Sequence, residues 1–207
     1  MIRVLFLDFG GVIADEGFYE GLKAVAARRG LQPEGFFRTA EEIIHEIGYV
    51  TGRTTEAEFW NAVRQRTGIR DDNAYLREQI LSRFILRPEV LALADSLRLS
   101  GIRVCILSDQ TDWLDELDRR TPYYHHFDRV FNSFVMHKSK RDASLFSDVC
   151  TEMGIEPGEA LFVDDNIGNV ARASDSGLKT IHVRGRLAPD MVRSFLRNLE
   201  KTESVIQ

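Results

Sequence analysis

The sequence predicts an α/β fold, in which a parallel β-sheet core carries an inserted α-helical subdomain. Short runs of β-branched and aromatic residues alternate with helical patterns from residue 88 onward. This alternation is typical of parallel strands joined by crossover helices. One more such run lies at the N-terminus, and residues 15–87 after it contain no strand pattern. A chain of 207 residues with 43% hydrophobic residues can bury one substantial core and a small second one.

Five short apolar runs are the expected strands. They are RVLFL, RVCIL, RVFNS, ALFV and KTIHV, which begin at residues 3, 103, 129, 160 and 179. Because turn signals and helical patterns separate them, we expect one parallel sheet whose strands are joined by crossover helices.

Amphipathic helices are expected to fill residues 15–87. The clearest is TTEAEFWNAVRQRTG, in which Thr55 opens a capping box and Gly68 closes the helix. We therefore divide the chain into a core, formed by residues 1–14 and 88–207, and a helical insertion between them.

Charge and composition exclude several classes of function. The formal net charge is −5 and no basic stripe is present, so a nucleic-acid partner is not expected. No apolar run is long enough for a membrane span or a signal peptide. Cys105 and Cys150 lie in an apolar run and a helical pattern, where buried free thiols are expected. We expect a soluble cytoplasmic protein, monomeric or homodimeric, with no membrane partner.

Polar residues directly follow several of the expected strands. In an open parallel sheet, ligands bind outside the carboxyl ends of the strands. Asp8 follows the first run and Ser108 the second, while Asp164 and Asp165 follow ALFV; Lys140 stands at the head of KRDASLFSDVCTEMG. A carboxylate can act as a nucleophile, further acids can hold a divalent ion, and Ser and Lys can grip phosphate oxygens. The set is suited to phosphoryl transfer.

Four stretches resemble, in order and spacing, the motifs of the haloacid dehalogenase superfamily, whose members are mostly Mg²⁺-dependent phosphatases. They are LFLDFGGVI, CILSD, KRDASLF and LFVDDNIGNV, and the match spans nearly the whole chain. Within the superfamily, the GG after the first aspartate, GRTTEAEFW and FVDDNIGNV look most like two groups. These are the glucose-1-phosphate phosphatase branch and the N-terminal phosphatase domain of soluble epoxide hydrolases.

The resemblance implies a Rossmann-like sheet with the first strand central and the second and fourth beside it. It implies that residues 15–87 are a mobile helical cap. It also implies a phosphatase that hydrolyses a small phosphomonoester, such as a sugar phosphate, through an aspartyl-phosphate. Its partner would then be a small-molecule phosphate ester.

The resemblance also assigns roles to residues. Asp8 would be the nucleophile, with Ser108 and Lys140 as its catalytic partners. The substrate phosphate would be held by Gly10, Gly11, Ser108, Asp109 and Lys140.

A Mg²⁺ site is implied at the same place. Its ligands would be the Asp8 carboxylate, the Gly10 carbonyl and Asp165, with Asp164 acting directly or through water and Asn169 orienting the surrounding shell. Physical chemistry supports the metal independently, because crowded carboxylates raise one another's pKa values unless a cation compensates. An all-oxygen set of ligands suits Mg²⁺.

Each residue alone has a simpler interpretation. Asp8 and Ser108 could end a turn or cap a helix, the double Asp could cap NIGNVARA, and Lys140 could be solvated. Their joint occurrence in one family's order favours the functional interpretation.

The third motif differs from the usual family pattern at two positions. Lys140 lies in KRD, where the family usually has Lys-Pro-Asp-Pro, and His137 stands where Gly is common. Lys138 is therefore a rival. Lys140 is preferred because its distance to Phe146 reproduces the family spacing and Ser133 is correctly placed upstream.

The third departure is Gly10, since most family phosphatases have a second Asp two residues after the nucleophile. One interpretation is a working phosphatase in which another residue donates the proton to the leaving group. Asp15 is the nearest candidate donor in the sequence. A working phosphatase could also act on a substrate whose leaving group needs little protonation. Alternatively it binds a phosphate ligand or partner without turnover. Carbon–halogen hydrolysis is disfavoured, because the enzymes of the superfamily that catalyse it have Tyr at this position and use no Mg²⁺. Small residues here let the backbone approach a phosphate closely.

Four residues of the insertion could face a sugar. They are Phe18, Tyr19, His45 and Trp60. Because residues at helical spacing are more often part of a core, they do not identify a substrate.

Overall fold

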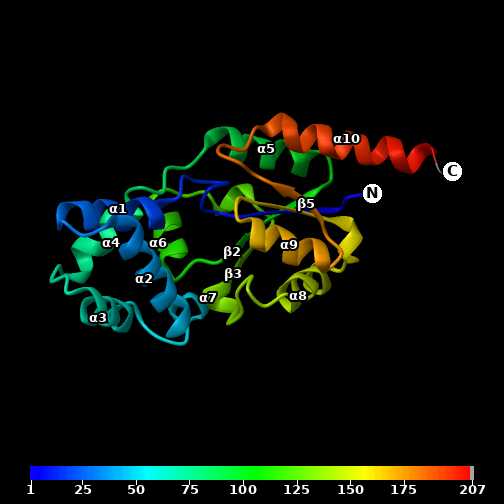
Figure 1. The fold of residues 1–207 in the computed structure, drawn as a ribbon. Helices are drawn as coiled ribbons and strands as arrows, with labels where there is room; N and C mark the ends of the chain where they lie inside the picture. The colour runs from blue at the N-terminus through cyan, green and yellow to red at the C-terminus, as the bar shows by residue number, and fades with distance from the viewer. Residues whose placement is uncertain (206–207) are drawn as a thin grey trace.

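The computed structural model describes residues 1–205, within which five parallel strands form one sheet (Figure 1). The strands are β1 (Val4–Leu7), β2 (Arg103–Ser108), β3 (Arg129–Asn132), β4 (Ala160–Asp164) and β5 (Lys179–His182). Their order is β3-β2-β1-β4-β5, so β1 is central and β2 and β4 flank it. The α/β class, all five strands and the central place of the first strand are confirmed.

The register aligns the ends of the three central strands. Leu7 of β1 pairs with Ile106 of β2 and with Val163 of β4. The residues that follow these three therefore reach the same edge of the sheet. All four residues of β1 are fully buried, which explains its continuous apolar sequence.

Helices cover both faces of the sheet (Figure 1). They are α5 (Pro88–Leu99), α6 (Trp113–Arg120), α7 (Ser133–Met136), α8 (Ser144–Met153), α9 (Ile167–Asp175) and α10 (Pro189–Val205), with short 3-10 turns η2 (Tyr124–His126) and η3 (Pro157–Glu159). One face packs against α8 and α9, while α5 and α10 lie on the other. This is the layered arrangement that crossover connections produce.

Residues 15–87, all of them described by the structure, contain helices and no strand. The helices are α1 (Gly17–Arg28), α2 (Pro33–Glu46), η1 (Tyr49–Thr51), α3 (Glu56–Thr67) and α4 (Asn73–Leu81). The predicted capping box is present, because the Glu58 amide donates to Thr55 Oγ1 and the Thr55 amide to Glu58 Oε2. Gly68 ends α3 with a φ of 77°.

The chain enters and leaves the insertion through two segments that lie side by side. The Asp15 amide donates to the Ile85 carbonyl at 2.9 Å, and the Arg87 amide donates to the Ile13 carbonyl at 2.9 Å. The buried Arg87 side chain ties these segments together, because its guanidinium donates to the Gly11 carbonyl and pairs with the Asp15 carboxylate at 3.1 Å.

An aromatic cluster packs the insertion against the start of α6. Tyr49 and Phe59 lie beside Trp113, and the Trp60 and Trp113 ring centroids are 6.1 Å apart. The Tyr49 hydroxyl also donates to Asp112 at 2.6 Å. Trp60 is fully buried, so it belongs to the core and not to a ligand site. The mobility of the insertion stays a prediction.

Cys105 on β2 and Cys150 on α8 are both free and buried, as expected. Burial raises the pKa of the Cys105 thiol to about 12. Among the helices of residues 1–205, none has the length and apolar character needed to cross a membrane. The cytoplasmic location stays a prediction.

Candidate active site

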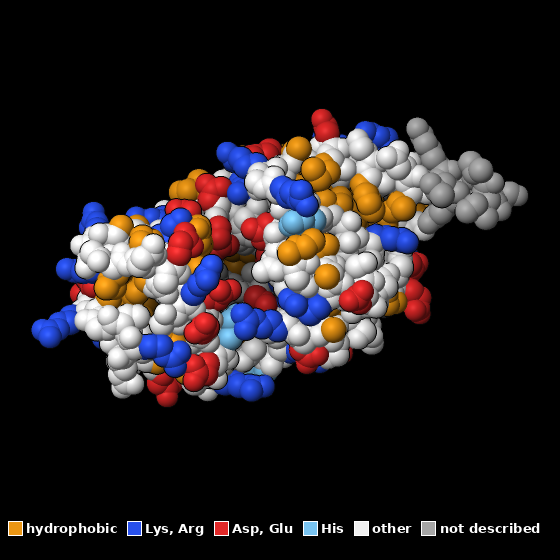
Figure 2. All heavy atoms as spheres, in the orientation of Figure 1, with side chains coloured by type: hydrophobic (Ala, Val, Ile, Leu, Met, Phe, Trp, Pro, Cys, Tyr) orange, Lys and Arg blue, Asp and Glu red, His pale blue; other side chains and the backbone are white. Residues whose placement is uncertain are grey.

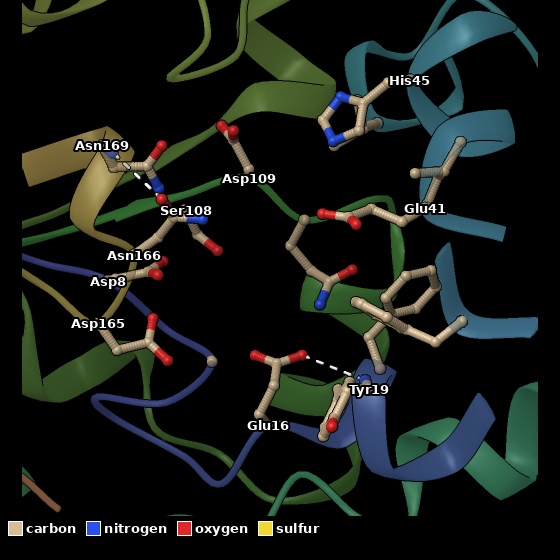
Figure 3. A pocket seen from close by; sticks show the side chains of 16 residues that line it. Asp8, Glu16, Tyr19, Glu41, His45, Ser108, Asp109, Asp165, Asn166 and Asn169 are labelled. Carbon is tan, nitrogen blue, oxygen red and sulfur yellow. Dashed lines mark hydrogen bonds between the residues drawn. The ribbon is translucent and has the colours of Figure 1, made fainter. Parts of the chain in front are cut away.

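The surface is hollowed between the helical insertion and the sheet, and acidic side chains gather there (Figure 2). The cavity has a volume of about 480 Å³. Asp8, Ser108 and Asp165 line it from the strand ends, while Tyr19 and His45 face them from the insertion (Figure 3). The shared edge of the parallel strands thus brings residues far apart in the sequence into one site.

Lys140 lies at the base of this site, in the turn that precedes α8 rather than in the helix itself. Its Nζ atom is 2.7 Å from Asp8 Oδ1 and 2.7 Å from Asp164 Oδ2. Burial alone would lower the pKa of this amine, but the neighbouring carboxylates outweigh burial and raise the pKa. Lys140 is therefore a buried cation. The rival Lys138 bonds to Ser144 and Asp148 at the surface of α8.

The Asp164 carboxylate is fully buried and surrounded by donors. Its Oδ2 accepts from Lys140 Nζ and from Asn169 Nδ2 at 3.1 Å, and its Oδ1 accepts from the Asn166 amide at 2.7 Å. Asp164 therefore fixes Lys140 and the start of α9. Its neighbour Asp165 lines the cavity instead.

The acids at this edge fit a hard divalent ion. Asp8, Asp164 and Asp165 each offer an oxygen, and these oxygens lie within 4.8 Å of one another. Burial, partly offset by Lys140, raises the pKa of Asp8 well above its usual value, and burial and Asp164 raise that of Asp165. A cation among these oxygens would relieve the cost of ionising them.

Gly11 makes the position of Asp165 possible. Its φ is +73°, a conformation that side chains disfavour. A Cβ atom at Gly11 would lie 2.1 Å from Asp165 Oδ2. The second glycine of the GG pair therefore keeps space for a carboxylate of the site.

Glu16 occupies the space beside the first glycine of the pair. A Cβ atom at Gly10 would lie 2.1 Å from Glu16 Oε2. Glu16 precedes α1, accepts a hydrogen bond from the Tyr19 amide at 3.4 Å and lines the cavity (Figure 3). Burial raises the pKa of Glu16 to about 7, and Asp165 adds to the shift.

The sequence pattern does not single out Glu16, and it favours Asp15 as the nearest replacement donor. In the structure, Asp15 pairs with Arg87 in the connection to the insertion and does not line the cavity. The only sequence signal for Glu16 is that it follows Asp15 within the first motif region, and nothing in the sequence shows which acid turns toward Gly10.

Two predicted binding residues, Ser108 and Asp109, both line the cavity but make different contacts. Ser108 ends β2, is buried and lines the cavity. Both oxygens of Asp109 accept from the Lys140 amide, at 2.9 and 3.1 Å. Burial raises the pKa of the Asp109 carboxyl. Its side chain therefore anchors the Lys140 turn.

The wall opposite the strand ends mixes rings with polar groups. It includes Phe18, Tyr19, Phe37, Glu41 and His45 of the insertion, while Gln110 lines the cavity from the loop directly after β2. Burial, with a contribution from Arg141, lowers the pKa of His45 to about 4, so this imidazole is neutral near neutral pH. The sequence had singled out Phe18, Tyr19 and His45, but Glu41 and Gln110 carry no motif.

Comparison with known families gives one match over most of the chain. Residues 2–177 match the model of the haloacid dehalogenase-like hydrolases. Over 131 residues the chain is 30% identical to bifunctional epoxide hydrolase 2 of Rattus norvegicus and 29% identical to that of Mus musculus. The alignments cover 60% of this chain and 22% of each relative, so the chain spans less than a quarter of the length of these curated relatives.

Solved structures with low sequence identity share the fold. A HAD-family enzyme from Bacteroides thetaiotaomicron, in complex with magnesium and inorganic phosphate, aligns with a TM-score of 0.72 at 23% identity, covering 89% of this chain and 96% of that one. A HAD-like family hydrolase from Porphyromonas gingivalis gives 0.70 at 24% identity, covering 94% and 98%. L-2-haloacid dehalogenase from Xanthobacter autotrophicus gives a TM-score of 0.64 at 20% identity, covering 88% of this chain and 78% of that one.

Proposed function

The chain belongs to the haloacid dehalogenase-like hydrolase family, and from that premise we propose that it is a Mg²⁺-dependent phosphatase of small phosphomonoesters. One observation carries the proposal: the buried Lys140 amine bridges the carboxylates of Asp8 and Asp164 at the base of the cavity. A cation held against the acid at the end of the first strand is what a phosphate-transferring nucleophile requires.

Asp8 is the proposed nucleophile. Its Oδ1 accepts from the Phe9 amide at 2.7 Å and contacts Lys140, so the carboxylate is held in one orientation. A carboxylate oxygen bonds to phosphorus while the bond from phosphorus to the leaving oxygen breaks, which yields an aspartyl-phosphate. Water then attacks the phosphorus, releases inorganic phosphate and regenerates the Asp8 carboxylate.

The surrounding groups stabilise charge on the transferred phosphoryl group. Lys140 offers a permanent positive charge, and Ser108 offers a hydroxyl at the end of the neighbouring strand. The amides of Gly10 and Gly11 complete the proposed phosphate site. Asp109 contributes indirectly, because it holds the backbone of Lys140.

The proposed Mg²⁺ ligands are the Asp8 and Asp165 carboxylates and the Gly10 carbonyl. Asp164 belongs to the same acidic group, but its two oxygens already accept three hydrogen bonds, so we assign it to positioning Lys140 and Asn169. When bound, the ion would supply positive charge to the phosphoryl oxygens and to the nucleophile. The magnesium and phosphate in the Bacteroides thetaiotaomicron enzyme support this assignment.

The cavity favours a compact substrate. Its volume of about 480 Å³ suits a phosphate ester with a leaving group no larger than a sugar. The rings of Phe18, Tyr19 and Phe37 offer apolar faces, and Glu41 and Gln110 offer hydrogen-bonding groups. Together they support a polyhydroxylated leaving group such as a sugar.

The test is a panel of aryl, sugar and alkyl phosphates assayed with and without Mg²⁺. Hydrolysis that requires Mg²⁺ is expected for at least the aryl esters. Binding of inorganic phosphate without turnover of any ester would favour the alternative of an inactive ligand-binding protein. Release of halide from a 2-haloacid would favour the reaction of the Xanthobacter autotrophicus neighbour instead.

A further inference from the structure

The position two residues after the proposed nucleophile has no side chain, yet the space beside it is filled. An added Cβ atom at Gly10 would lie 2.1 Å from Glu16 Oε2, 3.1 Å from its Cδ and 3.6 Å from its Oε1. The Glu16 carboxyl therefore stands where a side chain at residue 10 would begin. An acidic side chain at position 10 would therefore clash with the Glu16 carboxyl in its present position.

The Glu16 carboxyl also faces the reacting groups. Glu16 lies at the start of the insertion and projects into the cavity between Asp165 and Tyr19 (Figure 3). Oε1 accepts the Tyr19 amide hydrogen bond, whereas Oε2 is the oxygen beside Gly10. The carboxyl thus approaches the site from the insertion, the direction from which the leaving group of a bound ester would extend.

Helix capping alone explains this residue poorly. Short side chains such as Asp, Ser, Thr and Asn are the usual N-terminal caps. The Glu16 cap bond is long, at 3.4 Å, and placing a carboxyl beside Asp165 is electrostatically unfavourable. Asp15 does not supply an alternative acid, because it is paired with Arg87.

We propose that Glu16 is the proton donor to the leaving group and takes the place of the side chain absent at Gly10. This proposal rests on the phosphatase function proposed above. As the bond from phosphorus to the leaving oxygen breaks, the Glu16 carboxyl gives its proton to that oxygen, and the leaving group departs as an alcohol. In the second step the Glu16 carboxylate accepts a proton from the water that attacks the aspartyl-phosphate, so the enzyme returns to its starting state.

If Glu16 donates this proton, the rate of hydrolysis depends on Glu16 most strongly for poor leaving groups. Phosphoryl transfer has a loose transition state in most analyses, which places negative charge on the leaving oxygen. A positioned acid contributes about 10²- to 10⁴-fold when that oxygen is a poor leaving group. Aryl phosphates need this proton least, and alkyl phosphates need it most.

The experiment compares wild type with Glu16→Gln on a series of aryl and alkyl phosphates in Mg²⁺. Glutamine keeps the length and the cap acceptor but has no carboxyl proton. Glu16→Gln should lower turnover of alkyl phosphates by about 10²-fold or more and that of activated aryl phosphates by less than about tenfold. Glu20→Gln makes the same change at an exposed position of α1 and should match wild type.

A second variant relocates the acid. Gly10 does not have a positive φ, so an aspartate is compatible with its backbone once Glu16 is shortened. Gly10→Asp combined with Glu16→Ala should turn over alkyl phosphates at least about tenfold faster than Glu16→Ala alone.

The outcomes separate the two proposals. No Mg²⁺-dependent hydrolysis of any ester by wild type would overturn both. Hydrolysis by wild type and an unchanged leaving-group dependence in Glu16→Gln would overturn only the role of Glu16. Equal loss on aryl and alkyl phosphates, with no gain in the relocated variant, would also overturn that role.

Discussion

The Nζ atom of Lys140 lies 2.7 Å from Oδ1 of Asp8 at the carboxyl edge of the sheet, where Lys140 is fully buried and Asp8 is 13% exposed to the cavity. The contact joins the first motif region of the chain to the third. It gives the proposed nucleophile a permanent counter-charge, since the carboxylates around Lys140 raise the pKa of its amine.

Loss of the Lys140 amine should impair turnover severely. We expect Lys140→Ala to lower kcat by about 10²-fold or more, because preorganised charge at the transition state is lost. Lys138→Ala is the control, since its amine pairs with Asp148 on the outer surface, and it should change kcat by less than about twofold. A larger effect of Lys138→Ala would mean that Lys138 serves the site.

Gly11→Ala should weaken Mg²⁺ binding. The added Cβ atom would lie 2.1 Å from Asp165 Oδ2, at a backbone φ of +73°. We expect the Mg²⁺ concentration at half-maximal activity to rise by at least about tenfold. Gly30→Ala is a control for the backbone effect, because Gly30 has a φ of +67° and open space around its Cβ position. An equal shift in both variants would contradict the steric explanation.

Arg87 should stabilise the connection to the insertion. Its guanidinium binds the Gly11 and Val12 carbonyls and pairs with Asp15, so Arg87→Met leaves buried acceptors unpaired. We expect the free energy of unfolding to fall by about 2–3 kcal/mol in urea titrations. Arg3→Met removes a largely exposed pair with Glu159 and should cost less than about 0.5 kcal/mol. Equal losses of unfolding free energy in the two variants would show that the buried Arg87 contacts contribute no more than an exposed ion pair.

Mg²⁺ should stabilise the protein more as the pH rises. The pKa values of Asp8 and Asp165 are raised in the folded state, and that of Glu16 is raised to about 7. These three groups therefore bind more protons in the metal-free folded state than in the unfolded state, and their contribution to stability falls as the pH rises from their unfolded pKa values to about pH 7. Mg²⁺ requires ionised Asp8 and Asp165, so its stabilisation grows through the same window.

Thermal unfolding with and without Mg²⁺ measures this linkage. The increase in Tm caused by Mg²⁺ should be larger at about pH 7.5 than at about pH 5. In Asp8→Asn the increase should shrink and lose most of its pH dependence. A Tm increase that is largest at low pH would contradict binding by these carboxylates.

The sequence was sufficient to predict the parallel sheet and the edge of the sheet at which the candidate site lies. The strands are short runs that contain β-branched or aromatic residues, and helical patterns separate them, so the sequence predicted a parallel sheet with crossover helices. Residues that follow aligned parallel strands meet at one edge of such a sheet. Family spacing favoured Lys140 over Lys138, and the structure places Lys140 beside Asp8. His137, where glycine is common in the family, has a φ of 55°, the left-handed conformation that glycine adopts readily.

The sequence could not predict which of two adjacent acidic residues faces the cavity. Asp164 and Asp165 are adjacent, and only the end of β4 determines which faces the interior and which faces the cavity. Similarly, Asp15 and Glu16 differ by one residue, and the path into α1 directs the first to Arg87 and the second to Gly10. Such choices depend on the tertiary path of the chain and not on composition or spacing.

The central claim is a covalent aspartyl-phosphate on Asp8, and its most direct test is rapid acid quenching followed by peptide mass spectrometry. With excess aryl phosphate and Mg²⁺, we predict a phosphorylated peptide that contains Asp8 and forms within the first turnover. It should be absent in Asp8→Asn and without Mg²⁺. Turnover with no phosphorylated Asp8 peptide, or undiminished turnover in Asp8→Asn with contaminating phosphatase excluded, would contradict the account.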